Sequence, residues 1–276
     1  MGKLAVALAS PDRLPEAAAT GADLAELRLD LFDGTHDLRR VIEGRPLPLI
    51  ATLRPPREGG RYDGPDAERL RVLLAAARLG AEYVDLEWDA VTPAALDDLR
   101  AAGARVIVSR HAFDRMPDLE RWAGEIAALG PDVVKVVGTA RDARDCAPAL
   151  RALARAERPT IAIAMGEAGV ATRVLALRYE RCFLTFAALP AGGTAPGQVT
   201  IDEMLRVYRA RSIGPGTAVY GLFGPTPGRE LVENENRRLV EEGLDAVAVP
   251  FPTTGDPAAA VEALRELPLA DWRIVG

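Results

Sequence analysis

The sequence has few cysteines, few aromatic residues and no excess of positive charge. Its 276 residues include two cysteines and 5% aromatic residues, and the formal net charge is -6 at pH 7. This charge excludes the basic footprint that nucleic acids and anionic membrane surfaces require, so we expect neither as a partner. No apolar run approaches the roughly 20 residues that cross a bilayer. Cys146 and Cys182 lack metal-ligand spacing, which predicts reduced core thiols, no bound metal and a cytoplasmic location.

Lysine is unusually scarce. Of the 34 basic residues, only Lys3 and Lys135 are lysines. Lys135 lies in an apolar run of valines at residues 133–137, which is typical of a buried strand. A desolvated primary amine can lose its proton and attack a carbonyl carbon, whereas a guanidinium group stays charged. We therefore interpret Lys135 as a candidate for imine formation.

The chain is rich in alternating short strand-like and helical segments. Eight strand-helix units predict a (β/α)8 barrel, and the alternative, a doubly wound sheet, lacks its glycine-rich phosphate turn. The expected barrel strands are residues 4–9, 24–29, 48–54, 83–87, 105–111, 133–137, 160–165 and 183–187. A second pattern of expected strands at 217–224, 245–252 and 272–275, with helices at 228–242 and 257–267, predicts a small βαβαβ appendage. The expected domains are thus residues 1–212 and 213–276.

Polar residues alternate with apolar ones near the ends of the expected strands. The alternating pairs are Glu26 and Arg28, Thr52 and Arg54, Asp85 and Glu87, and Ser109 and His111. Residues two apart in a strand point to the same side, so we expect these groups to point into the barrel and its mouth. So many ionisable groups inside one barrel are costly unless they bind or transform a molecule, which favours an enzyme.

A series of short motifs resembles the type I 3-dehydroquinate dehydratase family over about residues 3–211. The motifs are Glu26-Leu-Arg-Leu-Asp30, Thr52-Leu-Arg54 followed by Glu58-Gly-Gly60, Asp85-Leu-Glu87, Ser109-Arg-His111-Ala-Phe113, Lys135 among valines, Met165-Gly-Glu-Ala-Gly-Val-Ala-Thr-Arg173 and Ala195-Pro-Gly-Gln198. The resemblance implies a shikimate-pathway lyase that dehydrates 3-dehydroquinate to 3-dehydroshikimate by syn elimination. It also implies an imine on the protein's own lysine and no cofactor.

The same resemblance implies roles for individual residues. Lys135 supplies the amine, and His111 dehydrates the carbinolamine, takes the C2 proton and returns a proton to the departing C1 hydroxyl. Glu58 orients His111 and supports it electrostatically. Glu26, Arg28 and Arg54 bind the substrate hydroxyls, and Arg173 binds the substrate carboxylate. Bidentate binding of that carboxylate is a geometry that lysine cannot reproduce.

A glycine-rich segment at residues 191–197 is suited to a lid over the ligand. We expect Thr194 and Gln198 to bind substrate from this segment. Two positions depart from the family pattern: Thr194 stands where serine is frequent, and Ala112 follows the histidine where Asp or Asn is frequent. Both departures leave the imine and acid-base residues in place.

The end of the chain has a resemblance of its own. Tyr220-Gly-Leu-Phe-Gly224, Asn236 and residues 243–251 resemble the opening of the substrate domain of shikimate dehydrogenase. The Ser-x-Ser-Pro stretch that binds the shikimate carboxylate is replaced by Arg229-Glu-Leu-Val-Glu233, and neither a lysine nor a dinucleotide-binding turn follows Ser212. We therefore expect residues 213–276 to be non-catalytic, either a truncated relic or a packing and interaction module. We expect them to pack on the barrel or on another subunit, so that a homodimer or another partner can be held through them.

Two other functions are alternatives to the dehydratase. A class I aldolase-type lyase also uses a barrel lysine, but the pairing of His111 with the motif ending at Gln198 disfavours it. A non-catalytic pathway subunit that recruits other enzymes through its tail is the second alternative. An assay that follows dehydroshikimate formation by its absorbance distinguishes the dehydratase from these two alternatives.

Overall fold

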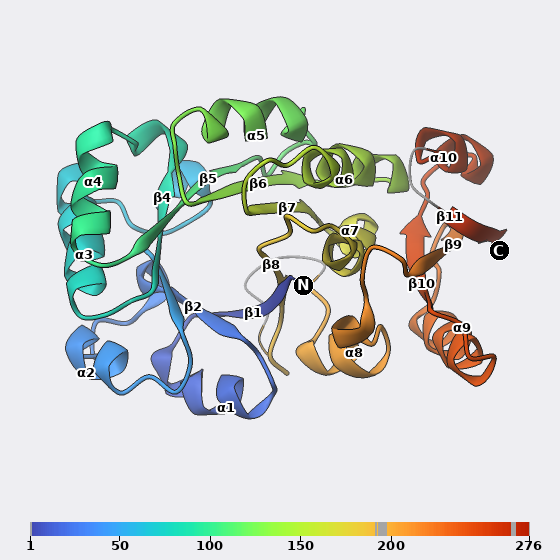
Figure 1. Ribbon diagram of the computed structural model, residues 1–276, viewed down its shortest axis with the longest axis horizontal. Coiled ribbons are helices and arrows are strands. Elements are labelled where there is room, and N and C mark those ends of the chain that lie inside the picture. The colour runs from blue at the N-terminus through green and yellow to red at the C-terminus, as the bar shows by residue number, and fades with distance from the viewer. Residues whose placement is uncertain (1, 191, 193–197, 266–268, 276) are drawn as a thin grey trace.

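The computed structural model describes residues 2–190, 192, 198–265 and 269–275, and this part of the chain contains two parallel sheets (Figure 1). The larger sheet has the strand order β7-β6-β5-β4-β3-β2-β1-β8. Its strands are β1 (Lys3–Leu8), β2 (Leu24–Arg28), β3 (Leu49–Thr52), β4 (Tyr83–Glu87), β5 (Arg105–His111), β6 (Val133–Thr139), β7 (Thr160–Met165) and β8 (Leu184–Ala187). A bridge between Thr160 and Cys182 closes the seam between β7 and β8. The predicted (β/α)8 barrel is confirmed.

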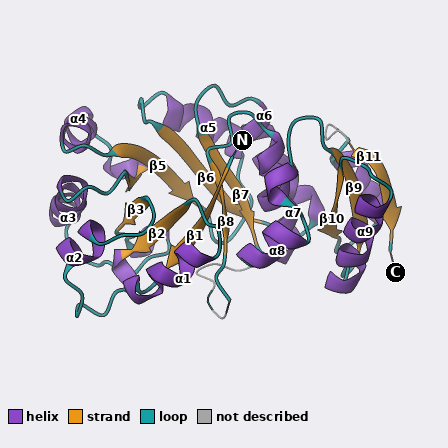
Figure 2. Cartoon of the chain, turned by 60° about the horizontal axis from the view of Figure 1, so that its bottom comes forward, coloured by secondary structure: helices purple, strands orange, loops and turns teal. Residues whose placement is uncertain are grey.

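Helices follow the strands and surround the sheet (Figure 2). They are α1 (Leu14–Ala19), α2 (Leu38–Glu43), α3 (Asp66–Arg78), α4 (Pro93–Ala101), α5 (Leu119–Ala127), α6 (Cys146–Ala154), α7 (Val170–Leu175) and α8 (Ile201–Arg206). Side-chain oxygens of Asp37, Thr92 and Asp118 accept backbone N–H groups at the first turns of α2, α4 and α5. Such caps satisfy donors that the helix itself leaves unpaired, so they fix where each helix begins.

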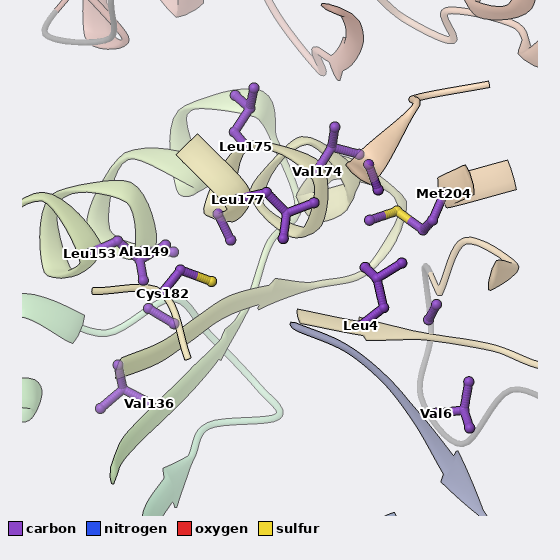
Figure 3. Packing of buried hydrophobic residues seen from close by; sticks show 14 of the residues in the cluster. Leu4, Val6, Val136, Ala149, Leu153, Val174, Leu175, Leu177, Cys182 and Met204 are labelled. Atoms are coloured by element: carbon purple, nitrogen blue, oxygen red, sulfur yellow. The ribbon is translucent and has the colours of Figure 1, made fainter. Parts of the chain in front are cut away.

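The alternation of side chains along the strands separates two apolar clusters. Val134 and Val136 belong to the cluster between the sheet and the helices, part of which is drawn in Figure 3. Val133 and Val137 belong to the cluster inside the barrel, together with Ile161. Lys135 has the parity of this inner cluster, so its strand aims the amine into the barrel.

Along β2 to β5, the inside of the barrel is apolar toward the N-terminal ends of the strands and polar toward their C-terminal ends. The apolar side chains include Leu24, Ile50, Tyr83 and Ile107, and each lies two residues before a polar one. The polar side chains above them are Glu26, Thr52, Asp85 and Ser109, all buried. The C-terminal face is where enzymes of this fold carry their active sites.

The appendage is a three-stranded parallel sheet of order β10-β9-β11. Its elements are β9 (Ala218–Gly224), α9 (Arg229–Glu241), β10 (Ala246–Pro252), α10 (Pro257–Ala263) and β11 (Leu269–Ile274). The rings of Phe223 and Phe251 stack at 4.7 Å between centroids. Asn236 ties α9 to β10, because its side chain donates to the carbonyl of Ala248 and accepts from the N–H of the same residue, at 2.9 and 3.0 Å.

Polar contacts join the appendage to the barrel beside α7. Asp142, after β6, accepts bonds from the backbone N–H and the hydroxyl of Thr254, at 2.8 and 2.9 Å. Arg229 on α9 pairs with Glu203 on α8 at 3.1 Å. Strand β11 lies on the side of the appendage away from the barrel (Figure 1). Among the residues just described, no helix has the length and apolarity that a membrane crossing requires.

Candidate active site

Glu58 and His111 form a buried pair at the barrel mouth. The Glu58 Oε2 atom lies 2.8 Å from His111 Nδ1 and also accepts the backbone N–H of His111 at 2.7 Å. Because Oε2 already acts as an acceptor toward the backbone, we assign the ring proton to Nδ1. The Nε2 atom, which makes no hydrogen bond to any residue that the structure describes, is then free to accept a proton.

The surroundings shift the pKa values of His111 and Glu58, and the shift at His111 favours the neutral imidazole that can act as a base. Burial, helped by the positive charges of Arg54 and Lys135, lowers the pKa of His111 well below its ordinary value. Burial raises the pKa of Glu58 to about 7, although Arg54 acts in the opposite direction. His111 is therefore neutral at neutral pH and able to take a proton.

Gly59 allows Glu58 to reach this position. It ends a short turn at Pro56–Glu58 with a φ of 77°, in the left-handed region that favours glycine. A Cβ atom at Gly59 would overlap the ring of Phe113. That ring lies nearly parallel to the imidazole of His111, with 6.0 Å between centroids and 14° between planes. The turn, Phe113 and Glu58 together restrict the orientation of His111.

Lys135 projects from β6 into the same pocket. Its amine nitrogen lies 2.8 Å from Asp85 Oδ2 and 3.2 Å from Glu26 Oε1, and 4.9 Å from the centre of the Phe186 ring. The side chain is 6% exposed, so the amine has little access to bulk water. The two carboxylates and the ring fix where the nitrogen points.

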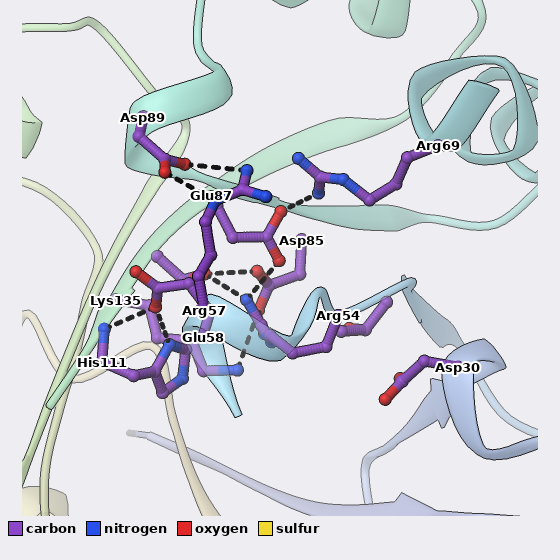
Figure 4. A network of polar contacts seen from close by, with 12 residues as sticks. Asp30, Arg54, Arg57, Glu58, Arg69, Asp85, Glu87, Asp89, His111 and Lys135 are labelled. Atoms are coloured by element: carbon purple, nitrogen blue, oxygen red, sulfur yellow. Dashed lines mark hydrogen bonds and ion pairs between the residues drawn. The ribbon is translucent and has the colours of Figure 1, made fainter. Parts of the chain in front are cut away.

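Arg54 connects Lys135 to a larger buried network of charges (Figure 4). Its guanidinium group lies 2.8 Å from Asp85 and 2.7 Å from both Glu87 and the Ser109 hydroxyl. Burial alone would raise the pKa of Asp85, but Arg54 and Lys135 hold it well below its ordinary range. Asp85 is therefore ionised and anchors the amine of Lys135.

Arg69 supports this network from helix α3. Its guanidinium group is fully buried and donates to Glu87. It occupies the core-facing stripe of α3 with Leu73, Ala76 and Ala77, at helical spacing. Arg69 is not among the residues predicted from the sequence, although a charged residue on that stripe was a usable signal. Asp85 and Glu87 were expected inside the barrel but were given no function.

Arg173 on α7 is buried without an acidic partner among the described residues. Arg173 is 2% exposed, and its Nε atom makes no hydrogen bond to any described residue. Its Nη1 atom donates to the carbonyl of Phe186 at 3.4 Å. Burial lowers its pKa to about 10. A buried cation of this kind would gain a strong charge-assisted pair from the carboxylate of a bound anion.

The structure brings most of the expected site residues to one pocket. Its lining includes Glu26, Arg28, Arg54, Glu58, His111, Lys135, Arg173 and Gln198. Arg28 is already paired with Asp30 at 2.7 Å. Thr194 and the expected lid at 191–197 lie outside the described residues, apart from Gly192. No group of three or more metal-ligating side chains occurs among the described residues.

The shifted pKa of Glu58 makes a testable prediction for Glu58→Gln. Below about pH 7 the carboxyl of the free wild-type enzyme is protonated and no longer a charged acceptor for Nδ1, so we expect the wild-type kcat/KM to fall with an inflection near pH 7. Glutamine cannot titrate, so the variant should have a lower kcat/KM and lack this inflection. Steady-state kinetics of both proteins between about pH 5 and 9 measure this pH dependence. An unchanged inflection in the variant would refute the assignment.

Stability provides an independent readout of the same shift. A carboxyl whose pKa is raised in the folded state stabilises the fold below the unfolded pKa, and this contribution is lost as the pH rises through about 7. The free energy of unfolding of Glu58→Gln should therefore increase relative to wild type between about pH 4.5 and 7. Denaturant unfolding at several pH values measures this difference.

Comparisons with known proteins agree with this geometry. The family model of type I 3-dehydroquinase matches residues 7–215. A 3-dehydroquinate dehydratase of Methanopyrus kandleri is 40% identical over 195 residues, which are 68% of this chain and 87% of the relative. A chloroplastic bifunctional 3-dehydroquinate dehydratase/shikimate dehydrogenase of Arabidopsis thaliana is 39% identical over 213 residues. That match covers 74% of this chain and 35% of the plant protein, so the chain spans about a third of that relative's length.

Solved structures extend the comparison. The 3-dehydroquinate dehydratase of Geobacillus kaustophilus superposes with a TM-score of 0.64 at 27% identity, over 74% of this chain and 88% of that one. The structure of a dehydroquinate dehydratase and shikimate dehydrogenase from S. pombe superposes with a TM-score of 0.63 at 22% identity. The match covers 99% of this chain and 56% of the S. pombe chain, so the two share the fold of barrel and appendage. From the family match over most of its length and from these relatives, the chain belongs to the type I 3-dehydroquinase family.

Proposed function

We propose that this chain dehydrates 3-dehydroquinate to 3-dehydroshikimate through an imine on Lys135. The observation that carries the proposal is the convergence of three groups on one pocket. These are the amine of Lys135, the neutral imidazole of His111 and the unpaired cation of Arg173. An electron sink, a base and a carboxylate-binding group are what the β-elimination of water from a hydroxy ketone acid requires.

The chemistry balances with these groups alone. The Lys135 amine adds to the ketone carbon, and loss of water from the carbinolamine gives an iminium that withdraws electrons from the neighbouring C2–H bond. Nε2 of His111 takes the C2 proton and returns it to the C1 hydroxyl, which leaves as water. Hydrolysis of the iminium then releases the product and restores the amine. Glu58 stabilises the imidazolium that forms between these two proton transfers.

Charge and position also support roles for the substrate-binding groups. Arg173 would bind the carboxylate, because no acid among the described residues neutralises it. Glu26, Arg28 and Arg54 would face the hydroxyls from the wall of the pocket. Arg54 is held by Asp85, Glu87 and Ser109, so it would contribute as a fixed cation that needs no rearrangement when substrate binds. Gln198 would contact the ligand from the wall of the pocket, and by resemblance Thr194 would also bind it.

An absorbance assay tests the activity directly. Mixed with 3-dehydroquinate, the purified chain should produce the ultraviolet absorbance of a conjugated enone carboxylate. Heat-inactivated protein and the Arg173→Met variant at low substrate concentration are the controls, and the variant should show a raised KM. No absorbance with a correctly folded chain would favour the non-catalytic subunit, and carbon-carbon cleavage products would favour the aldolase-type lyase.

We propose that residues 213–276 are a non-catalytic packing and interaction module, and that the chain works in the cytoplasm. The contacts of this module with the barrel involve α7, α8 and the loop at Asp142. The described hydrogen bonds and ion pairs of Lys135 and His111 are made within the barrel. Both cysteines are free and buried, and burial raises the pKa of Cys182 to about 12, which suits a reducing compartment.

Deletion of residues 213–276 tests this role. The deletion exposes the apolar surface of α7 under β10 and removes both bonds of Thr254 to Asp142, so stability should fall. A loss of about 1 kcal/mol lowers the Tm of a domain of this size by about 2–4 °C, and we expect a larger shift than that. The kcat should remain within about three-fold of the wild type. A truncated barrel that is equally stable but inactive would contradict the proposal.

A further inference from the structure

The amine of Lys135 donates to two buried carboxylates, Asp85 Oδ2 at 2.8 Å and Glu26 Oε1 at 3.2 Å. Opposite charges at this range favour the charged form of an amine, so Lys135 is an ammonium group before substrate enters. An ammonium group has no lone pair with which to attack a ketone. A neighbouring group must therefore accept a proton from Lys135 before the C–N bond can form.

Asp85 is a poor acceptor for this proton. Its Oδ2 atom also pairs with Arg54 at 2.8 Å, and its Oδ1 atom accepts the hydroxyl of Ser109 at 2.6 Å (Figure 4). Arg54 and Lys135 hold the pKa of Asp85 well below its ordinary range. Arg54 stays in place when Lys135 loses its charge, so Asp85 remains ionised.

Glu26 is held less strongly than Asp85. Among the described residues, Glu26 accepts hydrogen bonds only from Lys135 and from the hydroxyl of Thr52, at 2.9 Å. No arginine lies within ion-pair distance of it, and Arg54 acts on it through its charge alone. Both hydrogen bonds end on Oε1, which leaves Oε2 for the substrate hydroxyls. Glu26 is therefore the more basic of the two carboxylates that contact the amine.

We propose that Glu26 accepts a proton from the ammonium group of Lys135 as substrate binds, and returns it to the hydroxyl that leaves the carbinolamine. The inference rests on the proposed dehydratase function and adds a catalytic role to the binding of hydroxyls by Glu26. The transfer replaces two buried charges by two neutral groups, which relieves the cost of keeping an ion pair away from water. A substrate that fills the pocket excludes water and favours the neutral pair further.

The proton balance closes on Lys135 and Glu26. Glu26 becomes a carboxylic acid, and the free amine forms the C–N bond while the ketone oxygen takes the π electron pair. A second proton passes from the nitrogen to this oxygen, which gives the neutral carbinolamine. Glu26 then protonates the hydroxyl, the C–O bond breaks, and the nitrogen lone pair forms the C=N bond of the iminium. Both protons leave in the water, and Glu26 is again a carboxylate.

The other charged groups around the pocket leave a pH window in which this pair can be observed alone. Arg28, on the same strand as Glu26, and Arg54, after β3, stay charged as arginines. Glu58 has a pKa of about 7, and Arg173 on α7 has one of about 10. The pKa of His111 is well below its ordinary value. Between about pH 7.5 and 9 these groups therefore change little.

Glu26→Gln in the full-length chain tests the role. Glutamine keeps the shape of the side chain and an oxygen for the substrate hydroxyls, but it cannot accept the proton. The chain is mixed with saturating 3-dehydroshikimate, borohydride is added at intervals, and the adduct is measured as intact mass. At about pH 7.5 the adduct should form at least ~10²-fold more slowly than in wild type. Its rate should rise about ten-fold per pH unit toward pH 9, because the amine now loses its proton to water, whereas the wild-type rate should stay constant.

Two further variants separate proton transfer from loss of charge or shape. Asp85→Asn also removes one carboxylate from the amine but leaves Glu26, so its rate of adduct formation should not depend on pH in this window. Glu26→Asp restores a carboxylate one methylene shorter, so its rate should be independent of pH again, even if Glu26→Gln does not fold. Thermal unfolding of each variant is the folding check.

Three results would overturn the role of Glu26 while an active wild type upholds the dehydratase function. The first is a Glu26→Gln adduct that forms at the wild-type rate, and the second is one that forms slowly but independently of pH. The third is the pH dependence appearing in Asp85→Asn or Glu26→Asp. A wild type that forms neither adduct nor dehydroshikimate would refute the dehydratase function itself, and the role of Glu26 with it.

Discussion

Replacement of Lys135 by arginine should lower kcat by at least about 10⁴-fold, as much as replacement by alanine, which is the size of effect expected when a covalent nucleophile is removed. Arginine keeps the positive charge, so it can still pair with Asp85 and Glu26. It lacks a nitrogen that can lose its proton and attack the ketone. Dehydration rates of the two variants, with thermal unfolding as the folding check, measure the effect.

The second lysine supplies a matched control. Lys3→Arg makes the same chemical change near the rings of Tyr83 and Phe183, where the charge of the lysine is 5.8 and 5.0 Å from the ring centres. Arginine also stacks on aromatic rings, so this variant should keep wild-type activity. If Lys135→Arg retained a substantial part of the wild-type rate, the imine mechanism would be wrong.

Replacement of His111 by alanine should lower kcat by at least ~10²-fold, the usual contribution of general acid-base catalysis. The backbone N–H of residue 111 still donates to Glu58 in this variant, so the carboxylate stays in place and the loss reports on the imidazole alone. If dehydration of the carbinolamine depends less on His111 than the transfer of the C2 proton does, covalent adduct on Lys135 should accumulate while turnover slows. Rapid-quench kinetics with mass spectrometry of the intact protein detect both effects.

The other histidine is the control for this experiment. His36 lies near Asp12, at 3.3 Å, away from the lining of the active-site pocket. His36→Ala should therefore leave kcat unchanged. A near-wild-type kcat in His111→Ala would overturn the assignment of His111 to proton transfer, and loss of the adduct together with turnover would assign it to imine formation as well.

The sequence predicted the barrel because each strand obeys a simple alternation. Lys135 faces the interior while Val134 and Val136 face the helices, as expected of residues one apart in a strand. The scarcity of lysine separated Lys135 from the many arginines, which no periodicity could do. The polar ends of the strands predicted that Glu26 and Asp85 would lie inside the barrel.

Contacts between distant segments could not be predicted in the same way. That Arg54 is held by Asp85 and Glu87 depends on the stagger of β3 and β4, which strand alternation does not specify. The support of Glu87 by Arg69 depends on how α3 packs against β4. The shifted pKa values of Glu58 and His111 arise from burial, which is a property of the assembled barrel.

Reductive trapping tests the central claim most directly. The chain is incubated with 3-dehydroshikimate and borohydride, digested and analysed by mass spectrometry. Because Lys3 and Lys135 are the only lysines in the sequence, the position of an adduct is unambiguous. We expect one reduced adduct per chain, on the peptide that contains Lys135. An adduct on Lys3, or no adduct with an active chain, would contradict it.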